Sequence, residues 1–230
     1  MISFKNEPAL DSPRTAHPLT LISGLGILAA IIYNSWPLGY ILNPRIARIG
    51  LTSDLEASGE AYSWLFVGGD VLFGLLLLVI IWLLLKRHIP LMRQVFFALT
   101  GLAAFGVFTA VDALLPVNCT SDIRTCGYQG NQTLGIHDVT GAIAALGLFV
   151  GMVVAWRLSG TSRRLKRLCA VVLGVWSVWG LLFVLTPAAN EAKLPDIQQI
   201  AIVWQQLFLI LSGAGTYLII RVLEDLLRER

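Results

Sequence analysis

Four side chains that could act as acids, bases or metal ligands are expected in or beside apolar segments of this sequence. They are Asp70, Asp112, His137 and Asp138. Asp70 is the most informative, because it lies eight residues past Tyr62, or about 12 Å along a helix that begins at a membrane surface. An ionised carboxylate at that depth is costly unless it is paired, hydrated or protonated. We treat the four residues as a candidate catalytic site. The alternative is that Asp112 and Asp138 are hydrated helix ends and His137 is a capping residue.

Further polar residues could complete this site as ligand-binding groups, since they fall on the same outer side of the expected helices. They are Asn34, Asp54, Glu60, Ser63, Gln205 and Gln206. The inner half of the apolar segments holds almost no such groups, and this asymmetry predicts a polar pocket that opens to the outside. The two glutamines could instead join neighbouring helices.

Carboxylates beside a histidine can perform general acid–base chemistry when their surroundings separate their pKa values. A catalytic zinc ion usually has three protein ligands, and a site of His137 with Asp70, Asp112 and Asp138 would have an unusual composition. A divalent metal and enzymatic activity therefore stay open. The sequence contains no G-x-S-x-G motif and no glycine-rich phosphate loop.

These observations favour a membrane protein whose outward-facing acidic pocket binds or handles a lipid or another amphipathic small molecule. The first alternative is an intramembrane, metal-dependent lipid hydrolase. The second is a small proton- or cation-coupled transporter, because such proteins use buried acids.

The elements that carry these residues are predicted to be membrane-spanning helices. Hydrophobic residues make up 56% of the 230, charged residues make up 13%, and the mean hydropathy is +0.74. A soluble domain needs more charge to cover its surface. We expect an all-α bundle of six transmembrane helices, each about 20 residues long. They cover Leu19–Tyr40, Tyr62–Leu85, Met92–Leu115, His137–Leu158, Arg167–Pro187 and Gln199–Arg221. Gly147 and Gly151 fit a close contact between helices.

The distribution of basic residues predicts that both termini are cytoplasmic. With the N-terminus inside, 13 lysines and arginines lie inside and 4 lie outside, as positive-inside insertion requires. We expect a cytoplasmic tail at 1–18 and a transmembrane domain at 19–221. Extracytoplasmic loops are expected at 41–61, 116–136 and 188–198, and a second cytoplasmic tail at 222–230. The first helix is expected to stay as an uncleaved anchor in the inner (cytoplasmic) membrane of the cell.

Two cysteines are expected in the second extracytoplasmic loop. Cys119 and Cys126 could form a disulfide in an oxidising exterior, although two free thiols are the alternative. Cys169 is expected to be a packing residue on the cytoplasmic side. No continuous basic stripe suggests nucleic-acid binding, so the bilayer and a small ligand are the expected partners. The oligomeric state stays open.

Three short motifs carry a resemblance to a known family. They are the SDLEAS segment beginning at Ser53, the Asp112–Pro116 segment, and His137 followed by small residues. With these motifs the chain resembles the six-helix membrane proteins of bacteria and archaea called domain of unknown function 998, over roughly residues 40–160. It departs at Glu56, where the family more often has glycine, and in its longer cysteine-bearing loop. The resemblance implies the six-helix fold and little about function. In layout alone, the chain is distantly similar to membrane hydrolases of the alkaline ceramidase type.

Overall fold

The regular structure of this protein is helical throughout its described part. The computed structural model describes residues 21–49, 51–89, 91–115, 132–191 and 197–228, and these residues contain no strand. Six candidate spans are long and apolar enough to cross a membrane. The all-α fold class and the multi-pass membrane architecture are thereby confirmed.

The long helices are close to the predicted ones, and short helices lie between some of them. The long helices are α1 (Leu21–Tyr33), α4 (Ser63–Lys86), α5 (Arg93–Leu114), α6 (Gln132–Leu158), α7 (Arg163–Glu191) and α8 (Ile197–Arg228). The short ones are η1 (Trp36–Leu38), α2 (Gly39–Leu42), α3 (Pro44–Ile49), η2 (Thr52–Glu56) and η3 (Ser159–Thr161). Helix α8 continues past Arg221 because Val222 and Leu223 are buried in the core.

The first span is interrupted, unlike the continuous helix expected from hydropathy. Helix α1 ends at Tyr33, and the span continues through η1 and α2 to Leu42. Pro37 lies in the first turn of η1. Proline has no backbone N–H to donate to the carbonyl four residues earlier, and its ring clashes with that carbonyl, which here belongs to Tyr33, so Pro37 accounts for the break.

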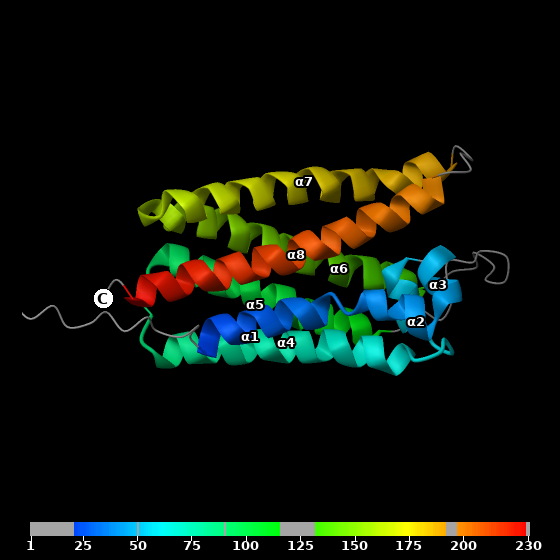
Figure 1. Cartoon of the computed structure of the whole chain (residues 1–230), viewed down its shortest axis with the longest axis horizontal. Helices are drawn as coiled ribbons and strands as arrows, with labels where there is room; N and C mark the ends of the chain where they lie inside the picture. The colour runs from blue at the N-terminus through cyan, green and yellow to red at the C-terminus, as the bar shows by residue number, and fades with distance from the viewer. Residues whose placement is uncertain (1–20, 50, 90, 116–131, 192–196, 229–230) are drawn as a thin grey trace, which may run out of the picture.

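Residues 36–49 and 51–56, which we call the cap, fold back on the start of α4, at the end of the bundle that the sequence predicts to be the outer one. The cap comprises η1, α2, α3 and η2, and it lies at the end of the bundle away from the C-terminus (Figure 1). Ile46, Leu55 and Phe66 form a small buried core, and Trp36 packs against it. Burial of these apolar side chains holds η2 against the bundle, so the segment expected to be an extracytoplasmic loop is an ordered part of the fold.

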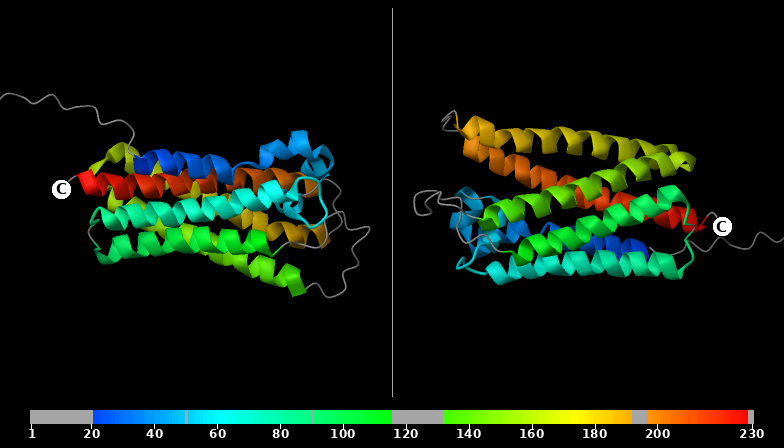
Figure 2. Two further views of the ribbon diagram at one scale, coloured as in Figure 1. Left: turned by 90° about the horizontal axis from the view of Figure 1, so that it is seen from below. Right: turned by 180° about the vertical axis from the view of Figure 1, so that it is seen from behind.

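The main core lies between the long helices, and Figures 1 and 2 show their arrangement. Helix α5 packs between α4 and α6, and α1 packs against α4 and α8. The α5–α6 contact is close because Gly101 faces Gly147 and Gly151: a Cβ on Gly101 would lie 2.5 Å from the Gly147 carbonyl oxygen. The helix–helix contact predicted for Gly147 and Gly151 is therefore confirmed.

Helices α1 and α8 are joined at the C-terminal end by a buried acid. Glu224 is 1% exposed and accepts a hydrogen bond from the hydroxyl of Ser23, which is fully buried. Arg228 Nη2 lies 3.2 Å and Arg221 Nη1 lies 3.5 Å from oxygens of the same carboxylate. Because two arginines compensate its charge, the buried carboxylate is tolerated there.

Candidate functional site

Two carboxyl groups meet where the cap covers the bundle. Glu56 ends η2 and Asp70 lies in the second turn of α4, and their side chains are hydrogen-bonded to each other. Two carboxyl groups within hydrogen-bonding distance repel each other strongly when both are ionised. The pair is therefore most stable when it holds one proton. The burial of Leu55 in the cap core places Glu56 over α4.

A third acid, Asp112, acts electrostatically on both of these groups and is paired with a histidine. Asp112, in the last turn of α5, has one carboxylate oxygen 3.0 Å from His137 Nδ1 of α6. Thr140 donates a hydrogen bond to the same oxygen. The contact crosses between neighbouring helices that the glycine contact holds together. The structure thus brings Asp112 and His137 together.

Tyr33 connects the two pairs. Its ring is buried, and it lies within electrostatic range of Asp70, Asp112 and Glu56. The ring also packs on Phe73 and Phe105, with centroids 4.6 Å and 5.4 Å away. Tyr33 therefore links a cluster of three aromatic rings to the three acids, and such apolar surroundings strengthen the electrostatic interactions between them.

The electrostatics favour a proton on Glu56. Burial raises the pKa of the Glu56 carboxyl well above its usual value, and the negative charges of Asp70 and Asp112 raise it further. Its hydrogen bond with Asp70 acts in the same direction. With the proton on Glu56, the hydrogen bond between the two carboxyl groups is donated by Glu56 and accepted by Asp70.

Several residues expected to bind a ligand form hydrogen bonds with the cap or within it. Gln205 Oε1 of α8 accepts a hydrogen bond from Thr52 N–H at 2.6 Å, and Gln206 donates to the Tyr40 hydroxyl at 2.9 Å. Within the cap, Asp54 accepts a hydrogen bond from Leu51 N–H at 2.7 Å. Glu60, just after it, accepts one from Asn43 of the cap at 3.0 Å. These contacts attach the cap to α8 and stabilise its turns.

The remaining predicted ligand-binding residues lie at the outer ends of α1 and α4. Asn34 follows Tyr33 and donates to the Ala30 carbonyl at 2.9 Å, while its Oδ1 is buried and accepts no hydrogen bond from any described residue. The Thr109 hydroxyl, one turn before Asp112, is buried without a partner among the described residues too. Ser63 begins α4 and is partly exposed. Unpaired buried polar atoms such as those of Asn34 and Thr109 are available to a ligand.

The described residues do not bring three metal ligands together. No group of three His, Cys, Asp or Glu side chains within that part of the chain could hold a metal ion. Asp112 and His137 offer two ligands, and the side chain of Asp138 lies outside the described residues, as do Cys119 and Cys126. Cys169 is a free, buried core residue, as expected.

Sequence reasoning missed two members of the site, Glu56 and Tyr33. Glu56 stands among other acids in a segment that looked like a solvated loop, and the tyrosine is one aromatic residue in an apolar helix. One signal in the sequence could have pointed to Glu56. It stands where the resembling family more often has glycine, and an added acid at that position needs a partner.

Comparison with known proteins gives one match. A family model described as a protein of unknown function, DUF998, matches residues 25–215, which is a longer segment than the motifs covered. No curated protein and no solved structure matches the chain.

Proposed function

The chain belongs to the DUF998 family of proteins of unknown function, and we propose that it binds a small amphipathic molecule with a positively charged head at the outer acidic site. The observation that carries this proposal is the Glu56–Asp70 carboxyl pair, with Asp112 within electrostatic range. A cationic head would stabilise the ionised pair and displace its proton, so ligand binding and proton release are coupled.

The depth of the site supports an amphipathic ligand. Tyr62 and Trp64 are 48% and 71% exposed at the start of α4, as is typical of aromatic residues at the level of lipid head groups. Asp70 lies six residues past Trp64, or about 9 Å deeper. The acids thus extend from the head-group level into the apolar layer, where a charged head with an apolar body is stable.

The proposal is tested by proton release from the purified protein in weakly buffered detergent. Tetraphenylphosphonium serves as the lipophilic cation, and choline, which has no apolar body, serves as the comparison. We expect about one proton to leave per tetraphenylphosphonium bound, as one shared proton requires, and weaker binding of choline.

Two variants and one control make the test specific. Asp70→Asn and Glu56→Gln each remove the ionisable pair, so we expect loss of proton release and at least about tenfold weaker cation binding. Glu60→Gln removes an acid that contacts Asn43 of the cap, and it should behave like the wild type. If all three substitutions weakened cation binding equally, the cation would be attracted by the overall negative charge of this end of the protein and not bound at the carboxyl pair.

Proton- or cation-coupled transport is the second candidate, and the same proton-sharing pair favours it. In proteoliposomes, a proton gradient should then drive uptake of the cation by the wild type and not by Asp70→Asn. Binding without uptake would restrict the function to ligand handling.

A further inference from the structure

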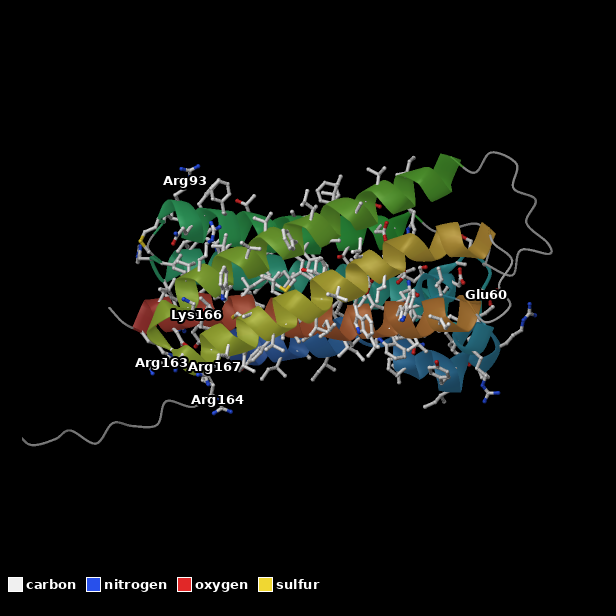
Figure 3. All side chains as sticks on the ribbon, turned by 90° about the horizontal axis from the view of Figure 1, so that it is seen from above. Glu60, Arg93, Arg163, Arg164, Lys166 and Arg167 are labelled. Atoms are coloured by element: carbon white, nitrogen blue, oxygen red, sulfur yellow. The ribbon has the colours of Figure 1, made fainter. Side chains whose placement is uncertain are left out.

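A cluster of basic residues lies at the start of α7, far from the acidic site. Arg163, Arg164, Lys166 and Arg167 are exposed there. Figure 3 shows them at the end of the bundle where α8 ends, while Glu60 lies at the opposite end. This end is the one predicted to be cytoplasmic, and the basic residues stand at the start of the candidate membrane span Arg163–Leu182.

Three of these arginines line a surface hollow together with two apolar residues. Arg163, Arg164 and Arg167 surround a space of about 520 Å³ that Leu168 and Val171 complete. No described residue forms a salt bridge or hydrogen bond with the three guanidinium groups. Arg221 and Arg228, at the same end, are by contrast paired with Glu224. The hollow therefore combines an apolar wall with positive charge that no described residue compensates by a salt bridge.

An exposed apolar stripe continues from the hollow along α7. Leu168, Val171, Val175 and Val178 are 45%, 61%, 43% and 57% exposed, and their spacing places them on one face of the helix. Helix α7 lies at the edge of the bundle, packed against α6 and α8 (Figure 1). This face is therefore open to the bilayer over more than two helical turns.

We propose that the hollow and the stripe together form a binding site for an anionic phospholipid. The lipid phosphate lies among Arg163, Arg164 and Arg167, because guanidinium groups bind phosphate oxygens in a bidentate manner. The acyl chain lies along Val171, Val175 and Val178. A membrane lipid fits better than free phosphate, since only a lipid uses the charged hollow and the apolar stripe at once. Basic pockets at the cytoplasmic surface of membrane helices bind such head groups.

The test measures binding of phosphatidylglycerol to the full-length protein in detergent by native mass spectrometry, with phosphatidylcholine as the neutral comparison. We expect retention of phosphatidylglycerol by the wild type. The triple substitution Arg163→Gln, Arg164→Gln and Arg167→Gln should weaken its binding at least about tenfold. The matched control is Lys86→Gln, Arg87→Gln and Arg93→Gln, which removes the same charge from the neighbouring connection and should change binding less than about twofold.

A charge-conserving variant keeps the proposal testable if the glutamine variant does not insert or fold. Arg163→Lys, Arg164→Lys and Arg167→Lys keep the positive charge and should still weaken binding several-fold, because lysine cannot bind phosphate bidentately. Equal binding of phosphatidylcholine would overturn the proposal. So would equal loss in the control variant, or displacement of the lipid by inorganic phosphate at millimolar concentration.

Discussion

Glu56 and Asp70 are placed to share a proton, because their carboxyl groups are hydrogen-bonded to each other and neither forms a salt bridge with a described residue. The groups that act on Glu56 most strongly, besides its burial, are the acids Asp70 and Asp112. Placing two acids side by side in a buried site lowers the stability of the folded protein. Such pairs are found mostly where a protein binds a cation or transfers a proton. The pair is therefore the residue-scale feature that most strongly indicates function.

The raised pKa of Glu56 predicts how stability depends on pH. Below the usual pKa of glutamic acid, Glu56 is protonated in both the folded and the unfolded state. As pH rises, the unfolded state ionises first, and the folded state loses stability until its own, higher pKa is passed. Glu56→Gln cannot ionise, so we expect the Tm of this variant to fall less than that of the wild type between about pH 5 and pH 8.

Thermal unfolding in detergent, followed by tryptophan fluorescence, measures this difference. Glu60→Gln is the control, because Glu60 accepts a hydrogen bond from Asn43 and lies outside the acidic site. An equal fall in Tm for wild type and Glu56→Gln would contradict a proton held on Glu56.

At the residue scale, the sequence predicted Asp70, Asp112 and His137 as candidate site residues, and it did not predict Glu56 or Tyr33. Depth along a helix identified Asp70, and position at neighbouring helix ends identified Asp112 and His137, whose contact the structure contains. The partner of Asp70 was not predictable, because Glu56 reaches it only through the folding of the cap. The hydrogen bonds of Gln205 and Gln206 with the cap could not be predicted for the same reason: they form only when the cap folds onto the bundle.

At the scale of elements, close contacts at glycines determine how near the Glu56–Asp70 pair and the Asp112–His137 pair can come to each other. Gly101 on α5 lies against Gly147 and Gly151 on α6, and Gly74 on α4 lies against the Gly106 carbonyl. These contacts set the spacing between α4, α5 and α6, the helices that carry Asp70, Asp112 and His137. Side chains added there would separate the helices.

Gly101→Val should therefore destabilise the protein by about 1–3 kcal/mol and weaken the Asp112–His137 contact. The control is Gly174→Ala in α7, where an added Cβ meets no atom within 4 Å. Denaturation of both variants in detergent measures the difference, and a Gly101→Val protein as stable as the control would show that the helices can move apart freely.

Hydropathy predicted the long helices well, because a span needs a run of apolar residues and little else. It did not predict the break at Tyr33 or the ordered cap. The cap depends on a few apolar residues, including Ile46 and Leu55, whose burial against Phe66 arises from tertiary packing. Short helices of this kind carry little periodicity, so their sequence resembles a loop.

For the whole molecule, the basic residues predict which end is cytoplasmic. Arg93, Arg163, Arg164, Lys166 and Arg167 lie at one end of the bundle, and the cap lies at the other (Figure 3). This segregation is consistent with the charge count in the sequence, although the orientation itself stays a prediction.

Cysteine labelling tests that orientation. A membrane-impermeant maleimide added to reduced, intact cells or spheroplasts should label Cys119 and Cys126, which the topology places outside. The variant Cys119→Ser with Cys126→Ser should lose labelling, because Cys169 is buried. Labelling that requires membrane disruption would reverse the topology.

The hydrogen bond between Ser23 and Glu224 spans 201 residues of sequence, and this has a consequence for biogenesis. Helix α1 is synthesised well before α8, so its buried serine meets this partner only after Glu224 has been translated. Until then, the Ser23 hydroxyl lacks the partner that it has in the folded protein. A chain that lacks a complete α8 leaves the Ser23 hydroxyl without Glu224, its hydrogen-bond partner in the folded protein.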